Sequence, residues 1–174
     1  MARSKIDYGI DLGTTNSAIS RMEKGEAKIK KLPHNDTIAS CAAFNKKGIL
    51  VGDKAHAKYR SEKSLALSKN IKQNAFIEFK RTMGTDEKYT SEYGGSLSSE
   101  ELSAEVLKSL KSFITDESFS SVVITVPAAF KNNQIEATRE AAKLAGFNHI
   151  ELLQEPVAAS MAYGLDSNKK DGFW

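Results

Sequence analysis

The chain has 174 residues and a mass of 19.0 kDa, which corresponds to one domain or to one large part of a bigger protein. Apolar residues make up 40% and charged residues 27%, proportions that are typical of globular proteins with a core of their own. The net charge of +3 is too balanced to favour a nucleic-acid partner or an anionic membrane surface, and no apolar run approaches the roughly 20 residues of a membrane span.

The cysteine content and the first residues both favour a cytoplasmic protein. Cys41 is the single cysteine, so an intrachain disulfide is excluded and a reducing compartment is favoured. Residues 1–9 contain two early basic side chains but no apolar stretch behind them, which does not fit a secretory signal. We therefore expect a cytoplasmic location.

The first part of the chain predicts an antiparallel meander. Apolar residues alternate with others over Lys5–Leu12, which indicates a strand. A polar loop, Gly13–Asn16, separates it from a second strand over Ser17–Met22. A third strand is predicted over Ala27–Leu32, after a short hairpin turn at residues 23–26 that contains a glycine.

The middle of the chain, residues 33–121, has a less regular pattern. Short apolar pieces at Cys41–Phe44 and Ile49–Val51 are separated by glycines, and we expect Cys41 to be a small buried residue. Residues 58–81 are mixed and rich in lysine, with no clear period. Residues 85–99 are rich in Gly, Ser and Thr, and this composition predicts a loop.

The last part of the chain predicts alternating strands and helices. Ser98 and Glu101 have the spacing of a capping box, and the apolar residues after them fall on one face of a helix. A β-branched run over Ser121–Val126 predicts a strand that is covered on both faces. A helix over Asn132–Ala145 and a strand over Phe147–Leu153 follow.

A final helix is predicted to begin at Pro156 and to end at Gly164. The order of elements is three strands, an insertion, and then strand, helix, strand, helix. A strand–helix–strand unit implies a parallel pair with a right-handed crossover. The sequence therefore predicts an α/β fold with a mixed sheet and flanking helices.

Residues 11–16, Asp-Leu-Gly-Thr-Thr-Asn, are the first candidate site. A turn with Gly13 at its apex exposes successive backbone N–H groups, and two threonine hydroxyls add further donors, which is the composition of a phosphate cradle. Asp11 ends the preceding strand, where a carboxylate can hold Mg²⁺ through water. An ordinary hairpin turn with satisfied polar side chains remains an alternative, since the common glycine-rich phosphate motifs are absent.

Two further charged positions remain open at this stage. Glu155 lies at a strand end and opens a helix, so it is either an acid favoured by the helix dipole or the second acid of a metal–phosphate site. Lys80 and Arg81, taken alone, indicate an exposed basic pair. The three histidines lack the spacing of metal ligands.

As a set, these segments resemble the Hsp70 (DnaK-like) chaperone family. Residues 10–17 are similar to the first phosphate loop of that family, and residues 79–84 to the segment with its catalytic lysine. Residues 123–128 resemble a strand of the family, and residues 155–164 resemble its connecting helix. The four motifs occur in the family's order and span nearly the whole chain.

The resemblance implies lobe I of the actin-like ATPase fold, in which two lobes close over a nucleotide. Residues 1–33 and 121–174 would form a ribonuclease H-like subdomain, and residues 34–120 a small inserted α/β subdomain. The cofactors implied are ATP and Mg²⁺. The implied phosphate-binding residues are Gly13, Thr14, Thr15 and Asn16.

The resemblance also implies the catalytic residues. Asp11 and Glu155 would bind waters of the Mg²⁺ ion, and Lys80 would reach the γ-phosphate and the attacking water. Phosphoryl transfer needs this kind of positioning and electrostatic stabilisation rather than covalent catalysis.

For the complete protein, the resemblance implies ATP hydrolysis coupled to the binding of unfolded or peptide clients by a C-terminal domain. A second, acidic and glycine-rich phosphate loop would follow Trp174, so we expect these residues to be part of a longer protein. A J-domain co-chaperone and a nucleotide-exchange factor are implied partners, and neither nucleic acid nor membrane is expected. A sugar or acetate kinase of the same fold and a non-catalytic actin-like module remain alternatives.

Overall fold

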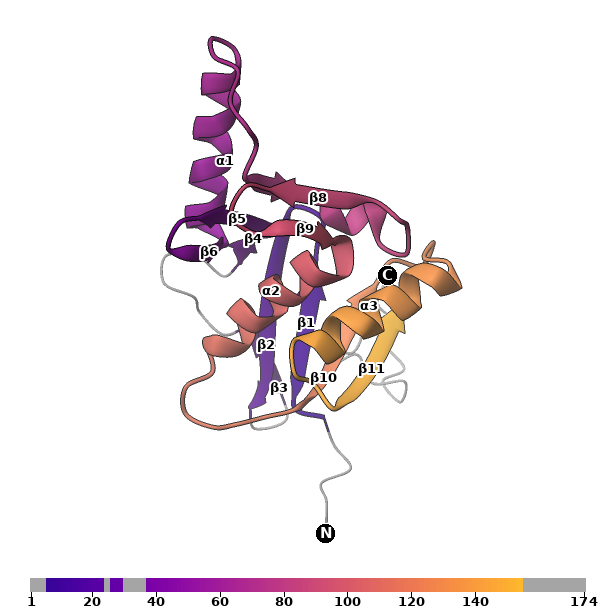
Figure 1. The fold of residues 1–174 in the computed structure, drawn as a ribbon. Helices are drawn as coiled ribbons and strands as arrows, with labels where there is room; N and C mark the ends of the chain where they lie inside the picture. The colour runs from indigo at the N-terminus through magenta and orange to yellow at the C-terminus, as the bar shows by residue number, and fades with distance from the viewer. Residues whose placement is uncertain (1–5, 24–25, 30–36, 155–174) are drawn as a thin grey trace, which may run out of the picture.

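A mixed six-stranded sheet forms the centre of the computed structural model, which describes residues 6–23, 26–29 and 37–154 (Figure 1). The strand order is β11-β10-β1-β2-β3, and β4 pairs with β2 beside this path. The strands are β1 (Tyr8–Leu12), β2 (Asn16–Glu23), β3 (Glu26–Ile29), β4 (Ile38–Ala39), β10 (Ser121–Val126) and β11 (His149–Gln154).

The pairing of β1 confirms both halves of the predicted topology. β1 pairs antiparallel with β2, which places Ile10 beside Ile19, and parallel with β10, which places Ile10 beside Ile124. β10 in turn pairs parallel with β11. Because β1, β10 and β11 run in the same direction, their carboxyl ends meet at one edge of the sheet, as do the loops that follow β1 and β10.

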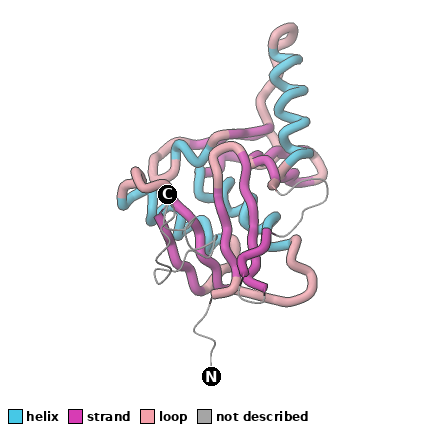
Figure 2. The backbone as a smooth tube through the Cα atoms, turned by 180° about the vertical axis from the view of Figure 1, so that it is seen from behind, coloured by secondary structure: helices cyan, strands magenta, loops and turns pink. Residues whose placement is uncertain are grey.

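β10 shows how the sheet is covered. Val122, Ile124 and Val126 are buried, whereas the residues between them are half-buried. Described helices therefore cover one face of β10, and cover of its second face stays a prediction. Figure 2 shows the opposite face of the sheet from behind, with no described helix across it. The predicted helix at residues 156–164 lies outside the described residues.

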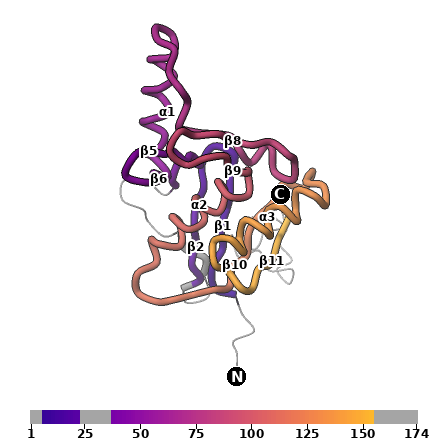
Figure 3. Tube along the Cα trace, in the orientation of Figure 1, coloured from indigo at the N-terminus to yellow at the C-terminus, as the bar shows by residue number. Residues whose placement is uncertain are grey.

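Helices α2 (Ser99–Ser112) and α3 (Asn132–Leu144) cover the other face (Figures 1 and 3). Both predicted helices are confirmed, and α2 begins with the predicted capping box of Ser98 and Glu101. α3 brings small alanines to the interface, which lets the two helices approach closely. α2 packs more extensively on α3 than on any other element, although it falls within the range expected for the inserted subdomain.

The segment between β4 and α2 forms two small sheets. The first has the order β6-β5-β7 and the second pairs β8 with β9. The elements are β5 (Cys41–Asn45), β6 (Gly48–Val51), α1 (Asp53–Ala66), β7 (Ala75–Ile77), the 3₁₀ helix η1 (Phe79–Thr82), β8 (Lys88–Ser91) and β9 (Gly95–Ser98).

Two predictions for this segment are corrected. Residues 85–99 are not a plain loop, because they contain the β8–β9 hairpin, whose short strands carry mostly polar side chains. Residues 53–66 form a helix, α1, that the lysine-rich pattern did not reveal. α1 projects away from the body of the protein (Figure 1). Among the described residues, no helix is long and apolar enough to cross a membrane.

Candidate nucleotide-binding site

The loop between β1 and β2 has a conformation that requires glycine. A Cβ atom on Gly13 would overlap with the carbonyl oxygen of Asn16, well inside the contact distance of any real side chain. The backbone therefore folds tightly over residues 13–16, at the sheet edge where β1 ends. This confines the loop to a narrow turn, with Thr14 half-buried and Thr15 exposed.

Ser40 holds the loop from behind. Its backbone N–H donates to the Thr15 carbonyl oxygen at 2.8 Å, and its Oγ donates to the Gly13 carbonyl oxygen at 2.8 Å. The Ser40 Oγ also meets the Ser17 Oγ at 2.7 Å, and both serines are buried. Two acceptors of the loop are thus occupied by the protein itself, which leaves the loop as a set of donors.

The remaining donors fit a phosphate group. No hydrogen bond within the described part of the chain uses the hydroxyl of Thr14 or Thr15. Backbone N–H groups and two hydroxyls on a tight glycine turn are the donor set that binds phosphate oxygens in proteins. The sequence did not single out Ser40, although a lone serine within an apolar segment signals a buried hydroxyl that needs a partner.

Asp11 stands exposed at the end of β1 beside this loop. Its neighbour across the parallel pair is Thr125, whose Oγ1 donates to the Asp11 Oδ1 at 3.2 Å. This bond orients the carboxylate and leaves lone pairs for water. The described ranges contain no group of three or more His, Cys, Asp or Glu side chains placed to hold a metal directly. A lone exposed carboxylate fits Mg²⁺ held through its water shell.

Glu155, the second predicted acid, lies outside the described residues. β11 ends at Gln154, which pairs with Val126 at the end of β10. The role of Glu155 in binding the metal therefore remains a prediction.

Lys80 lies within η1 and is 8% exposed. Its Nζ is 5.4 Å from the centre of the Phe130 ring, in the connection that follows β10. This is a cation–π distance, and it places the ammonium group near the edge where the parallel strands end. The interpretation of an exposed basic pair is wrong for Lys80 but fits Arg81, whose side chain is 68% exposed and lies 3.7 Å from Glu78.

Contacts with two helix N-termini hold the Lys80 turn. The Gly84 N–H donates to Glu100 Oε1 at 2.9 Å in the first turn of α2. The Asn133 Nδ2 at the start of α3 donates to the Gly84 carbonyl oxygen at 3.2 Å. A Cβ on Gly84 would lie 2.8 Å from the Asn133 carbonyl oxygen, so the two segments touch at backbone distance. The Thr82 Oγ1 adds a 2.5 Å bond to the Ser99 Oγ.

The structure thus brings three of the predicted features to one end of the sheet. The phosphate-type loop and Asp11 follow β1, and Lys80 reaches the connection after β10. Figure 1 shows the β1–β2 loop at the end of the sheet next to β8 and β9. A cation, a carboxylate and a cluster of unused donors form a charge pattern suited to a polyphosphate with a bound divalent ion.

Comparisons with known proteins point to one family. A family model described as "Hsp70 protein" matches residues 7–173. The chain is 37% identical over 175 residues to the "Chaperone protein DnaK" of Mycoplasma mycoides subsp. mycoides SC. This alignment covers 98% of the chain and 28% of that relative's length. Neither finding favours the sugar or acetate kinase or the non-catalytic actin-like module, and the mixed α/β fold agrees with the actin-like lobe expected from the resemblance.

Proposed function

The chain belongs to the Hsp70 family, and from this we propose that it binds the phosphates of ATP at the loop of residues 13–16. The observation that carries the proposal is the pair of hydrogen bonds that Ser40 donates to the loop. Because Ser40 occupies the Gly13 and Thr15 carbonyl oxygens, the loop is preorganised with its donors free for a ligand. Preorganised donors lose little free energy on binding, since they need not reorganise around the phosphate.

The charged residues have distinct roles in this proposal. Asp11, oriented by Thr125, accepts hydrogen bonds from water molecules in the Mg²⁺ shell, and Glu155 is the second acid for the same shell. The bound Mg²⁺ supplies charge neutralisation for the β- and γ-phosphates. Lys80 brings a fixed ammonium group toward the γ-phosphate, where its charge stabilises the developing negative charge.

The chain spans 28% of the length of the DnaK relative, so the activity of a complete protein is part of the proposal. We assign residues 1–33 and 121–174 to the ribonuclease H-like subdomain and residues 34–120 to the inserted subdomain. In a complete protein, ATP hydrolysis is coupled to the binding of peptide clients, and a J-domain co-chaperone and a nucleotide-exchange factor act on the cycle. The proposed location is the cytoplasm.

The first test is made on the chain itself. A ¹⁵N-labelled sample is titrated with Mg²⁺-ATP while amide chemical shifts are recorded. We expect shifts at residues 13–16 and around Lys80, and their loss in Gly13→Ala, whose folding is checked by circular dichroism. Shifts confined to other parts of the chain would contradict the proposed site.

The second test separates chemistry from binding. Residues 1–174 replace the aligned segment of the DnaK relative, and single-turnover ATP hydrolysis is measured beside ATP affinity. Lys80→Ala is expected to slow hydrolysis by about 10²–10³ while ATP affinity changes far less. Arg81→Ala, which removes the adjacent exposed cation, is the matched control and is expected to leave both unchanged. An unaltered rate in Lys80→Ala would remove this lysine from the site.

A further inference from the structure

The positive charge of the chain is concentrated in one projecting segment. Residues 53–73, which comprise α1 and the loop that follows it, hold six Lys or Arg residues and two acids, a net charge of +4. The whole chain has a net charge of +3, so the rest of it is slightly negative. We call this segment the basic arm. Figure 1 shows the far part of α1 extending away from the sheets.

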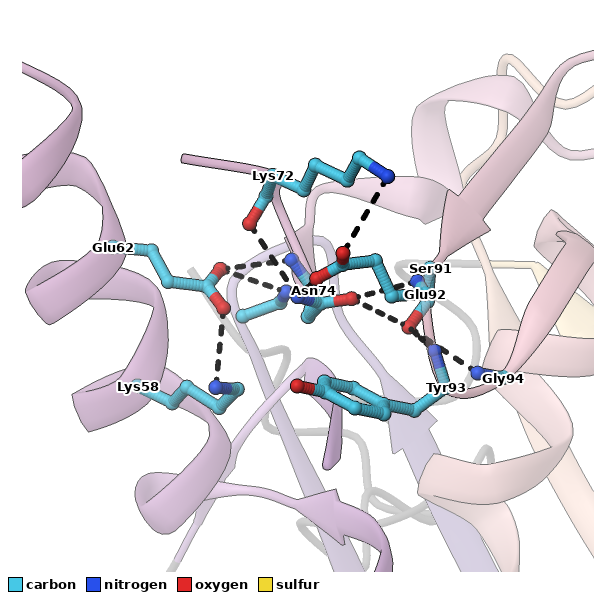
Figure 4. Close-up of polar contacts among 9 residues, drawn as sticks. Lys58, Glu62, Lys72, Asn74, Ser91, Glu92, Tyr93 and Gly94 are labelled. Atoms are coloured by element: carbon cyan, nitrogen blue, oxygen red, sulfur yellow. Dashed lines mark hydrogen bonds and ion pairs between the residues drawn. The ribbon is translucent and has the colours of Figure 1, made fainter. Parts of the chain in front are cut away.

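Both acids of the basic arm are turned toward the protein. Asp53 Oδ1 accepts from the backbone N–H of Ala39 at 3.2 Å. Glu62 accepts from the backbone N–H groups of Asn74 and Ala75 at 3.0 Å each, and it forms an ion pair with Lys58 at 3.2 Å (Figure 4). The acids are therefore engaged at the root of the arm and do not neutralise its outer surface.

The outer surface of the arm keeps its cations available. Four of them form no ion pair with any residue in the described ranges: Lys54, Arg60, Lys63 and Lys69. Every residue from 63 to 70 is exposed, and the tip includes Leu67, which is 89% exposed. This end of α1 thus has a positive charge that no described residue neutralises.

A groove of about 660 Å³ opens at the root of the arm. Aromatic and aliphatic side chains from α1, β7 and β8 line it together with two lysines and two acids, so the net charge of the groove is near zero and the excess positive charge lies on the adjoining arm. Lys72 meets Glu92 at 3.5 Å across the groove (Figure 4). The lining side chains that offer apolar surface are Tyr59, Phe76, Ile77 and Tyr89.

One wall of the groove is an open strand edge. β7 pairs only with β5 among the described strands, and the Phe44 N–H donates to the Asn74 carbonyl oxygen at 2.9 Å. In an antiparallel pair, alternate residues bond to the partner, so Ala75 and Ile77 direct their main-chain groups to the opposite edge. Glu62 occupies the Ala75 N–H, whereas the main-chain groups of Ile77 form no hydrogen bond with described residues.

We propose that an extended acidic segment of a partner protein binds in this groove and adds a strand at the open edge of β7. The main-chain groups of Ile77 pair with the segment, alternate apolar side chains enter the groove, and its carboxylates face the basic arm. An open strand edge matches a polypeptide main chain, which a nucleic acid lacks.

The test uses a pool of fluorescein-labelled peptides about seven residues long, a common strand length, in which glutamate alternates with Val, Ile, Leu or Tyr. Binding to the 174-residue chain is followed by fluorescence anisotropy. We expect saturable binding that is at least about tenfold tighter than that of the lysine counterparts, because charge complementarity selects the sign of the ligand. Amide shifts at Ile77 and Tyr89 are expected to locate the bound peptide.

Variants of the protein and of the peptide separate the contribution of charge from that of strand pairing. Lys63→Glu combined with Lys69→Glu changes two exposed residues and is expected to weaken binding several-fold, whereas Lys143→Glu on α3 is the control with no effect. Peptides N-methylated at alternate amides keep their charge but lose main-chain donors, and we expect them to lose binding. Equal binding of the N-methylated peptides, binding of single-stranded DNA in their place, or no binding of any acidic peptide would overturn the proposal.

Discussion

Helices α1 and α2 have the same length, 14 residues each, but the protein holds them in different ways. α2 begins with a side-chain cap from Ser98 and buries seven residues against the core. α1 begins after Gly52 without a side-chain cap and buries only Ala55. The comparison shows that α2 is stabilised by packing along its whole length, whereas α1 is stabilised by contacts near the end where it joins the protein.

This difference corresponds to different tasks. The first turn of α2 contributes Ser99 and Glu100 to the clamp on the Lys80 turn, so its position fixes a proposed catalytic group. The far end of α1 is exposed, as are the residues that follow it up to Asn70, and its surface is available to a partner. α2 thus holds the Lys80 turn in a fixed position, whereas α1, a helix of equal length, presents exposed charge.

The largest expected effect comes from the core face of α2. Leu107→Ala removes a side chain with no exposed surface, and we expect a loss of about 2–5 kcal/mol in the free energy of unfolding. Leu65→Ala on α1 makes the same chemical change at a residue that is 43% exposed, and about 0.5 kcal/mol or less is expected. Urea denaturation of both variants measures the contrast, and equal losses would show that α1 packs as closely as α2.

The next effect concerns the root of α1. Glu62→Ala leaves the N–H groups of Asn74 and Ala75 without their acceptor, and we expect a cost of about 1–3 kcal/mol. Glu62→Gln retains a carbonyl acceptor and is expected to cost less. Glu105→Ala on α2 removes only an exposed pair with Lys108 and is the control, at about 1 kcal/mol or less. Faster amide exchange at residues 74 and 75 in Glu62→Ala alone would support the assignment.

Cys41 lies in the small apolar cluster that α1 covers, and the ionisation of its thiol makes the stability of the chain depend on pH. Burial raises the pKa of the Cys41 thiol from 9.0 to about 12, and the negative charge of Glu62 adds to this rise. The folded chain keeps a proton that the unfolded chain loses, so this contribution to stability is complete below pH 9.0 and declines as the pH rises toward 12.

Cys41→Ala removes this titration. Wild type is therefore expected to lose stability relative to Cys41→Ala between about pH 9 and about pH 11, by at most about 1.4 kcal/mol per pH unit. Denaturation at several pH values measures the difference. Parallel pH profiles would mean that the thiol ionises as readily in the folded chain as in the unfolded chain.

The smallest effect concerns the start of α2. Ser98→Ala removes the Oγ that accepts from the Glu101 N–H at 3.1 Å, and we expect a loss of about 1 kcal/mol. Ser64→Ala on exposed α1 deletes the same hydroxyl where it caps nothing, so its expected cost is near zero. Thermal denaturation distinguishes the two, and a silent Ser98→Ala would indicate that Glu101 finds another partner.

The elements that the sequence predicted are the buried ones, and the elements that it missed are the exposed ones. α2 was predicted because its capping box and its apolar spacing both report burial, and β10 because its β-branched run indicates a strand. α1 gave no such signal, since a helix that buries only Ala55 needs no apolar stripe. The β8–β9 hairpin was missed because its strands present mostly polar, exposed side chains, and these resemble the composition of a loop.

The site divides in a similar way. The sequence pointed to residues 11–16 because tight turns and phosphate loops depend on local residue types such as Gly13. It did not show the burial of Lys80, which depends on Phe130 and on contacts with α2 and α3 that are distant in sequence. Ser40 was missed for the same reason, since its partners lie in a different strand and loop.

Because β1 pairs with β10, the central sheet can form fully only after β10 has been synthesised. Asp11 lies beside Thr125, its hydrogen-bond partner 114 residues later in the chain. At the usual rate of translation, β1 and β2 emerge about 5–20 s before β10, and the edge of β1 stays open for that time. The hairpin is local and fast, whereas closing the long loop is entropically costly. The binding site therefore becomes competent only late in synthesis, and until then the open edge of β1 is exposed to mispairing.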